Sequence, residues 1–196
     1  ERIVEDKDAA ANLKLIKEVN TGILIAPAAR LRRWLASLTN DNAQGEYYLT
    51  DIIALAVQEQ LPIHTATPND VYEVMGVNDR VQLATLERYY QSQQINQLML
   101  AGVTVRDPGR LDIRGTVQVG RDVTIDVNVL LEGHIVLGNR VKIGPQAVIR
   151  NAQIGDDVEI LPNCVIEEVV IGAHCRIGPF ARLRPETVLA EHVHIG

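Results

Sequence analysis

Three single polar residues in this sequence stand where a purely structural strand or loop would not require a polar side chain. They are Glu5 in IVEDKDA, Asn20 in EVNTGI and Asn78 in GVNDR. A carboxylate and two carboxamides offer hydrogen-bonding groups to a polar ligand. Each residue also has an ordinary structural interpretation: Glu5 as a solvated strand end, Asn20 as a turn former and Asn78 as the cap of a helix.

A further candidate is Arg184 in ARLRP, near the end of the sequence, with Arg182 near it. A planar guanidinium group donates two parallel hydrogen bonds, which suits phosphate oxygens. The alternative is that Arg184 is simply an outward residue after the inward Leu183. His192 and His194 have a spacing that could hold a metal ion, but His194 lies between two inward residues and should point to solvent.

The composition limits the possible functions. A net charge of −6 and a pI near 5.4 give no electrostatic footprint for nucleic acid or an anionic membrane. No apolar run approaches the roughly 18–20 residues of a membrane span, and no signal peptide opens the sequence. We therefore expect a soluble cytoplasmic protein. Because the sequence starts at Glu1 and stops within a repeat at Gly196, we also expect an internal piece of a longer chain.

A six-residue repeat dominates the sequence from Val119 to Ile195, and the step shortens to five only twice. One column holds the aliphatic residues Val119, Ile125, Leu131, Leu137, Ile143, Ile149, Ile154, Ile160, Ile166, Ile171, Ile177, Leu183, Leu189 and Ile195. A second column, two residues ahead, holds small or β-branched residues and includes Cys164 and Cys175, which we interpret as small buried hydrophobes.

A six-residue step matches neither a helix face nor one long strand, but it suits a β-helix, in which three hexads form a triangular coil. The two short hexads, starting at Ile149 and Ile166, should then lie on the same face of adjacent coils. Glycines such as Gly138 and Gly155 should occupy sharp corners that need small or positive-φ residues, together with Asn and Asp at positions such as Asn163.

The preceding residues predict a different architecture. Short β-branched runs at 2–5 and 21–26, a helix from Ala28, a second helix after Thr50-Asp51 and a strand around Ile63 indicate an α/β layer in residues 1–77. Residues 78–101 contain no Gly or Pro before Leu100 and predict one long linking helix capped at Asn78-Asp79. The hexads of residues 102–196 should begin after the Asp107–Gly109 turn.

The hexads IGPQAV, IGDDVE, IGAHCR and IGPFAR resemble the left-handed parallel β-helix of hexapeptide acyltransferases. Through IVEDKDA, EVNTGILIA, DNAQGEYYLTDIIALA, GVNDR, LAGVTVRDP and GPFARLRP, all 196 residues resemble the family of bacterial bifunctional N-acetylglucosamine-1-phosphate uridyltransferases and glucosamine-1-phosphate N-acetyltransferases. The resemblance implies the C-terminal part of the uridyltransferase domain, the linking helix and the first coils of the acetyltransferase domain.

This resemblance implies specific roles. Glu5 would bind sugar hydroxyls of UDP-N-acetylglucosamine, Asn20 would lie beside the sugar and ribose, and Asn78 would coordinate Mg²⁺ with an earlier aspartate. Arg184 would contact the phosphate of glucosamine 1-phosphate. The pocket-lining candidates in GEYYLTD are Glu46, Tyr48 and Thr50.

The implied partners are UTP, N-acetylglucosamine 1-phosphate, glucosamine 1-phosphate and acetyl-CoA, with a homotrimer formed through the β-helix. The family's glycine-rich nucleotide loop and its acetyltransferase lysine and histidine have no match here, so we expect the 196 residues to be inert in both reactions. Two alternatives stay open: a single-activity sugar-nucleotide pyrophosphorylase with a regulatory β-helix, or a non-catalytic trimerisation module.

Overall fold

The structure is a computed structural model that describes residues 2–196. The chain divides into two compact units, and the boundary in the sequence lies between Asn78 and Asp79. The second unit begins with helix α3 (Arg80–Leu100) and continues as a series of parallel strands. These are β1 (Thr104–Val105), β2 (Leu111–Val119), β3 (Thr124–Ile125), β4 (Val129–Leu137), β5 (Lys142–Ile143), β6 (Val148–Ile154), β7 (Glu159–Ile160), β8 (Val165–Ile171), β9 (Arg176–Ile177), β10 (Arg182–Leu183), β11 (Val188–Leu189) and β12 (His194–Ile195). A short 3₁₀ turn, Pro108–Arg110, separates β1 from β2.

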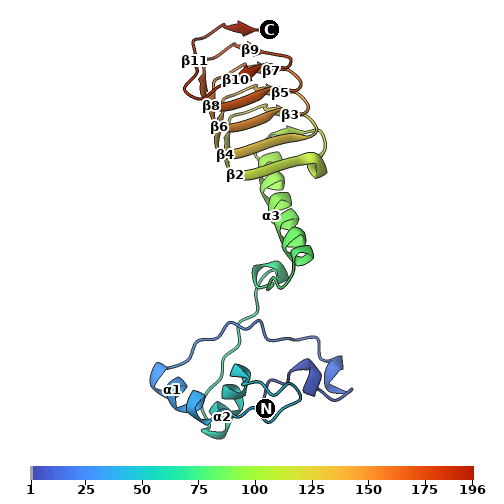
Figure 1. Ribbon diagram of the computed structural model, residues 1–196, viewed down its shortest axis with the longest axis vertical. Helices are drawn as coiled ribbons and strands as arrows, with labels where there is room; N and C mark the ends of the chain where they lie inside the picture. Colours follow the sequence, from blue (N-terminus) through green and yellow to red (C-terminus); the bar gives the residue numbers. More distant parts are fainter. Residues whose placement is uncertain (1) are drawn as a thin grey trace. The chain divides into compact units, whose positions relative to one another are not determined.

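The strands stack into a parallel β-helix of about five coils (Figure 1). One sheet has the order β1-β3-β5-β7-β9-β12, and the other has the order β10-β8-β6-β4-β2, with β11 also paired to β8. Each long strand of the second sheet contains a residue with positive φ near its middle, at Gly115, Gly133, Asn151 and Glu168. These residues bend the strand, so that a single strand forms two sides of the coil.

Both predicted apolar columns lie inside the β-helix. Ile125, Leu131, Ile149 and Ile166 are fully buried, and only the terminal members of the columns, such as Leu189, are partly exposed. Fully burying one such side chain contributes about 1.5–3 kcal/mol. Cys164 and Cys175 are free and buried, which confirms their interpretation as core residues.

The two short hexads lie on the same side of adjacent coils, as their spacing predicts. They occupy β6 and β8, where Ile149 pairs with Ile166 and Ile154 with Ile171 in unbroken register. The register shifts once, between β4 and β6, where a longer coil meets the first shorter one. There the Asn151 carboxamide occupies the space that a Cβ on Gly133 would need, and Asn151 Oδ1 accepts a hydrogen bond from the His134 amide at 3.0 Å.

The residues at the corners of the coils agree with the sequence prediction only in part. Asn163 has positive φ, as do Asp122, Asn128 and Asp157 at other corners, but Gly138 and Gly155 do not. Among the glycines that follow an aliphatic residue of the repeat, only Gly178 does. The other predicted glycines between the coils, such as Gly138, have ordinary φ values and lie against the next coil, where an added Cβ on Gly138 would lie 2.7 Å from the backbone of Gly155. Close approach between coils, rather than backbone conformation, therefore requires glycine at these positions.

Helix α3 covers the first coil. Ile95 and Leu98 are buried in the same core as the strand residues, so the helix shields one end of the stack from water. The cap is Asp79, whose carboxylate accepts a hydrogen bond from the Gln82 amide at 2.8 Å, and Asn78 lies outside the helix. The first coil also starts earlier than predicted, because β1 precedes the Asp107–Gly109 turn and pairs with β3.

The first unit forms the predicted helices but not the predicted sheet. Helices α1 (Ala28–Ser37) and α2 (Ile52–Gln58) pack around Trp34 and Ile52, and 3₁₀ turns span Asp6–Asp8, Leu13–Leu15, Leu49–Asp51 and Val71–Glu73. Residues 2–78 contain no β-strand, which corrects the α/β prediction for this part. The β-branched run at 21–26 is extended, but its backbone has no ladder partner and Ile25 is fully exposed, because composition favours a strand only where a neighbour can pair with it.

No helix within residues 2–196 is both long enough and apolar enough to cross a membrane.

The close approach between coils predicts that Gly138→Ala destabilises the β-helix. Its Cβ would overlap backbone atoms of the next coil, and overpacking of this kind costs about 1–3 kcal/mol. The matched control is Gly109→Ala, where the added Cβ meets only Asp107 Oδ1, at 3.4 Å. Urea unfolding should show a lower free energy of unfolding for Gly138→Ala alone. Equal effects of the two substitutions would contradict the close-packing account.

Candidate functional site

The first unit brings two of the predicted residues together across 45 positions of sequence. Thr50 Oγ1 donates a hydrogen bond to Glu5 Oε1 at 3.0 Å. Both residues are partly buried, so their polar atoms are partly shielded from water. The motifs IVEDKDA and GEYYLTD therefore form one structural cluster.

Neighbouring hydrogen bonds fix the loop against the Asp6–Asp8 turn. The Tyr48 hydroxyl donates to Asp8 Oδ2 at 3.1 Å and accepts from Gln44 Nε2 at 2.9 Å. The Ala43 amide donates to the other oxygen of Asp8 at 2.9 Å, and Lys7 Nζ donates to Gln44 Oε1 at 2.6 Å. Removal from solvent, and to a lesser degree the nearby Asp8 carboxylate, raise the pKa of Tyr48, so its hydroxyl stays protonated and remains a donor.

Sequence reasoning did not single out Asp8, Gln44 or Lys7, although Lys7 and Asp8 lie in IVEDKDA and Gln44 in DNAQGEYYLTD. The sequence marks these residues only by their position inside those motifs. Hydrogen bonds between residues about 35 positions apart leave no local pattern in a sequence. Glu46 has an exposed side chain, and its backbone is held by Asn42, whose Oδ1 accepts from the Glu46 amide at 3.2 Å.

The other two predicted residues of this unit do not join the cluster. Asn20 is exposed in an irregular segment, and Asn78 is exposed at the end of the unit. Asn78 would offer Mg²⁺ a single carbonyl oxygen, and a Mg²⁺ site usually combines one or two carboxylates with water and substrate phosphate oxygens. Across residues 2–196, no group of three or more His, Cys, Asp or Glu side chains could hold a metal ion. The role of Asn78 as a Mg²⁺ ligand stays a prediction.

Arg182 and Arg184 have different surroundings in the β-helix. Arg182 lies on β10, where its guanidinium group pairs with Glu167 Oε2 at 3.5 Å. Arg184 follows β10, and its carbonyl oxygen accepts hydrogen bonds from the Thr187 amide at 3.2 Å and the Thr187 hydroxyl at 2.6 Å. The backbone at Arg184 is thus fixed while its side chain is exposed to solvent.

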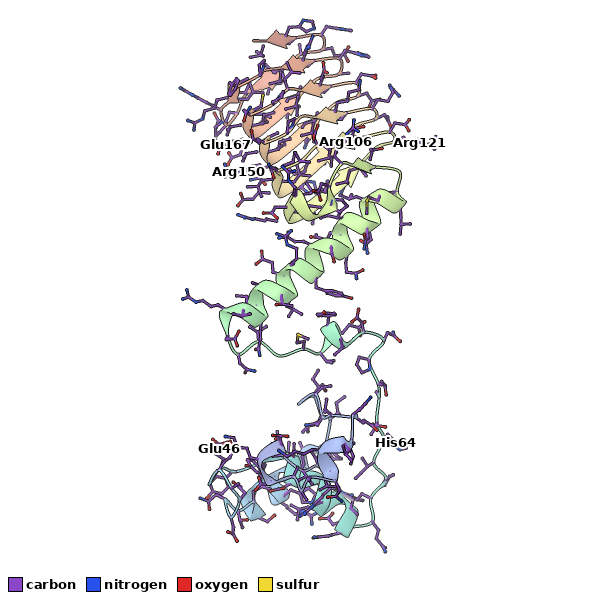
Figure 2. All side chains as sticks on the ribbon, turned by 90° about the vertical axis from the view of Figure 1, so that its right-hand side faces the viewer. Glu46, His64, Arg106, Arg121, Arg150 and Glu167 are labelled. Carbon is purple, nitrogen blue, oxygen red and sulfur yellow. The ribbon has the colours of Figure 1, made fainter. Side chains whose placement is uncertain are left out.

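The Arg182 pair ends a ladder of alternating charges along one side of the coils. Arg150 donates to Glu132 Oε2 and to Glu167 Oε1, both at 2.8 Å, and Figure 2 shows Arg150 and Glu167 side by side on successive coils. The two carboxylates raise the pKa of Arg150. Since the charges of Glu132, Arg150, Glu167 and Arg182 compensate one another, we interpret this ladder as structural.

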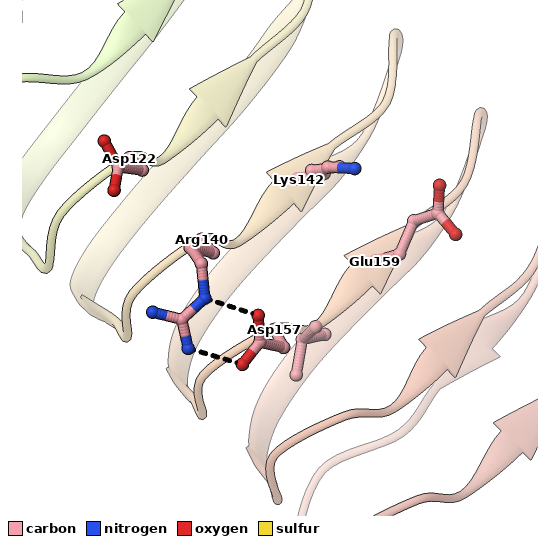
Figure 3. Close-up of a pocket in the computed structure, with 6 residues that line it drawn as sticks. Asp122, Arg140, Lys142, Asp157 and Glu159 are labelled. Carbon is pink, nitrogen blue, oxygen red and sulfur yellow. Dashed lines mark hydrogen bonds and ion pairs between the residues drawn. The ribbon is translucent and has the colours of Figure 1, made fainter.

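A shallow hollow of about 430 Å³ opens at another corner of the coils (Figure 3). Its lining residues are Asp122, Arg140, Lys142, Asp157, Val158 and Glu159. Arg140 Nε and Nη2 each donate to Asp157 at 2.6 Å, and this pairing lowers the pKa of Asp157 and raises that of Arg140. The His174 ring lies 3.7 Å from Asp157 and stacks on His192 with ring centroids 4.8 Å apart.

The next pair along this corner is held by hydrogen bonds between adjacent coils. Asn139 donates to Asp156 through its side chain at 2.9 Å and through its backbone amide at 2.8 Å, and these bonds lower the pKa of Asp156. Within the hollow, Arg140 pairs with Asp157 and Glu159 pairs with Arg176, in each case between adjacent coils, and these pairs help to stabilise the stack.

The family comparison matches the β-helix. Residues 113–196 match the family model described as the GMPPB C-terminal domain. Among solved structures, the chain is similar to a mutant of perosamine N-acetyltransferase from Caulobacter crescentus, in complex with CoA and GDP-perosamine. The two are 16% identical, and the match covers 66% of this chain and 78% of that chain with a TM-score of 0.32. The family match includes none of residues 2–78.

The lowered pKa values predict a loss of stability in acid. Because the folded-state pKa of Asp156 and of Asp157 lies below the unfolded value of about 3.9, their contribution is complete above that value and is lost as pH falls through the folded pKa. The double variant Asp156→Asn/Asp157→Asn should therefore show a smaller decrease in the thermal midpoint between pH 6 and pH 3 than the unmodified protein.

The control for this experiment is Asp122→Asn, since Asp122 lines the same hollow but takes no part in these hydrogen bonds. Circular dichroism at each pH measures the midpoint. If the double variant and Asp122→Asn follow the same pH profile as the unmodified protein, the two pairs do not link stability to pH.

Proposed function

We propose that this chain is part of a sugar-nucleotide enzyme in which the first unit binds the sugar of UDP-N-acetylglucosamine. The observation that carries the proposal is the Glu5–Thr50 hydrogen bond, together with the Tyr48–Asp8 bond beside it. A carboxylate held by a neighbouring hydroxyl keeps acceptor lone pairs for sugar hydroxyls. The match of residues 113–196 to the GMPPB C-terminal domain supports the same broad class.

The proposed activities are those of the bifunctional family: acetyl transfer from acetyl-CoA to glucosamine 1-phosphate, then uridylyl transfer from UTP to N-acetylglucosamine 1-phosphate with release of pyrophosphate. Asn20 and Asn78 are proposed as further contacts to UDP-N-acetylglucosamine, and Glu46 as a lining residue. Mg²⁺ would neutralise phosphate charge in the uridylyl transfer. The chain's residues supply no complete site for it, so we derive no step through the ion.

In the β-helix, Arg184 is the proposed contact to the phosphate of glucosamine 1-phosphate. Its exposed guanidinium group on a fixed backbone supports this role, because the donors can reach a ligand without breaking an internal bond. A homotrimer formed by packing of the flat β-helix sides is part of the same proposal. The alternatives are a single-activity pyrophosphorylase and a trimerisation module without catalysis; light scattering over a dilution series tests assembly in each case.

Titration with UDP-N-acetylglucosamine tests the proposed site. We expect saturable binding by calorimetry and about tenfold weaker binding by Glu5→Gln, since a hydrogen bond to a charged group contributes about 1.5–3 kcal/mol. Asp6→Asn is the control, because Asp6 lies on the adjacent turn and pairs with Lys14 at the surface. Absence of saturable binding at millimolar ligand, or equal losses in the two variants, would overturn the assignment.

A second titration uses glucosamine 1-phosphate and Arg184→Gln, with Arg182→Gln as the control. Turnover assays complete the test, with UTP and N-acetylglucosamine 1-phosphate or with acetyl-CoA and glucosamine 1-phosphate. We expect no product from the 196 residues in either reaction. Clear turnover would contradict the proposed inertness, and it would leave the binding assignments to be judged by the titrations.

A further inference from the structure

One side of the β-helix carries an outward column that contains no charged residue. The second halves of strands β2, β4, β6 and β8 form this side together with β11, and Figure 1 shows the four longer strands stacked in that order. The register places the outward residues one above another in five rows, and they are Gln118, Val136, Gln153, Val170 and Val188. Val170 is 44% exposed and Val188 is 72% exposed, so apolar side chains meet water on this surface, which we call the Gln/Val face.

The corner next to this face presents polar residues in the same five rows. These residues form the corner column, and they are Thr116, His134, Asn151, Glu168 and Glu186, all of them exposed. The Thr116 hydroxyl lies 2.9 Å from His134 Nδ1, and when it donates there, Nε2 carries the proton and can donate to a carboxylate. Glu168 takes part in no ion pair within residues 2–196, whereas the adjacent Glu167 pairs with two arginines.

Two copies of the Gln/Val face complement each other when their β-helices run in opposite directions. A two-fold axis that crosses the third row sets the first row of one copy against the fifth row of the other, and the second row against the fourth. Val136 of each copy then faces Val170 of the other, so two apolar contacts form. Gln153 faces its own counterpart at the axis, where each carboxamide can donate to the other and accept from it. Only the outermost rows are mismatched, because Gln118 faces Val188.

The corner columns match in the same arrangement. His134 of each copy faces Glu168 of the other, which sets an imidazole donor against a carboxylate acceptor, and Thr116 faces Glu186 in the same way. If both copies ran in the same direction, a two-fold axis along the coils would set each corner column against a Gln/Val face. Glu168 would then face Val170, and the carboxylate would lose water without gaining a partner.

The other two sides of the coil are not self-complementary in this way. On the side formed by β3, β5, β7, β9 and β12, opposed copies would set Lys142 against Arg176 and Glu159 against itself. On the side formed by the first halves of the long strands, Glu132 would face Glu167. Like charges that face each other are destabilising, so charge selects the Gln/Val face.

We propose that two copies of this chain pack through their Gln/Val faces with antiparallel β-helices. Five rows about 4.8 Å apart and a side of about four residues span roughly 24 by 13 Å. This area lies at the small end of specific interfaces, so the dimer is weak and reversible. The proposal goes beyond the proposed function and does not rest on it. The other two sides stay available to the proposed homotrimer, whose copies would run in the same direction.

Sedimentation velocity tests the association and the face that carries it. Over about 0.01–1 mM protein, the range in which small interfaces dissociate, the unmodified chain should convert from monomer to dimer. Val170→Lys should weaken this association about tenfold or more, because it buries an unpaired charge at two symmetric positions. Val165→Lys is the control, since Val165 is an outward residue of the same strand β8 on another side of the coil, and it should leave the association unchanged.

A charge exchange tests the corner column. Glu168→Lys should weaken the dimer about tenfold, since a charge-assisted hydrogen bond is lost at two symmetric positions. The double variant His134→Glu/Glu168→Lys should restore the association, because each introduced lysine then faces an introduced carboxylate. Additive losses in the double variant would contradict the facing of these two residues.

Crosslinking tests the antiparallel orientation. The backbones of packed sheets lie about 10 Å apart, too far for a disulfide, so a short bismaleimide is the probe. Gln153→Cys should crosslink to itself. Gln118→Cys and Val188→Cys should crosslink when the two variants are mixed, but neither should crosslink alone, because each residue lies at the opposite end of the partner's face. Cys164 and Cys175 are buried, so the unmodified chain measures background labelling.

Three outcomes overturn the proposal. They are a chain that stays monomeric up to about 1 mM, an association that Val170→Lys and Val165→Lys weaken equally, and an assembly in which Gln118→Cys and Val188→Cys fail to crosslink with each other. Thermal unfolding identifies a variant that has lost its fold. If Val170→Lys has lost it, Val170→Ser takes its place and should weaken the association to a smaller extent. If Val165→Lys has lost it, Thr124→Lys on β3 becomes the control.

Discussion

The burial of aliphatic side chains by one coil against the next is the interaction on which the rest of the structure depends. A single coil of two or three short strands cannot shield Ile125 or Ile143 from water, but coils stacked above and below exclude water from both. The same stacking satisfies the backbone, since the strands of each coil pair with those of its neighbours. At the first coil, where no further strand follows, helix α3 supplies the cover through Ile95 and Leu98.

Stacking also decides which polar residues become neighbours. Residues 17 or 18 positions apart lie one above another, so Glu132, Arg150 and Glu167 form a ladder and Arg140 meets Asp157. The ladders use their charges internally, whereas Arg184, near the far end of the stack, has an exposed side chain. The first unit follows a different principle, because its cluster of Glu5, Thr50 and Tyr48 is held by side-chain hydrogen bonds between two irregular segments.

The sequence predicted the β-helix well because the inward columns repeat at fixed steps, and even the paired short hexads at Ile149 and Ile166 followed from counting. The prediction for the glycines was wrong in part. Gly138 has ordinary φ and lacks space for a Cβ, whereas Gly178 has positive φ, and the residue type alone does not distinguish these two requirements. The sequence also overestimated the α/β layer: a β-branched run predicts extended backbone, but whether a partner strand exists is not a local property. The handedness of the coil rests on resemblance, because periodicity carries no chirality.

The candidate sites were predicted unevenly for the same reason. Glu5 and Thr50 were singled out in separate motifs, and their contact could not be read from either one. Asp8 and Gln44 belong to the cluster only through the residues beside them in space, and no spacing in the sequence marks them. The role of Arg184 is a prediction from its motif, and the structure adds that its backbone is fixed by Thr187.

Amide hydrogen exchange along the whole chain tests the central claim most directly, because protection reports which hydrogen bonds open only with global unfolding. If stacked coils carry the stability, the amides of the strands between Val123 and Ile177 should exchange slowest and as one cooperative block, while those of residues 16–26, which belong to no helix or sheet, should exchange without protection. Fast exchange throughout the predicted coils, or protection confined to residues 2–78, would contradict the account.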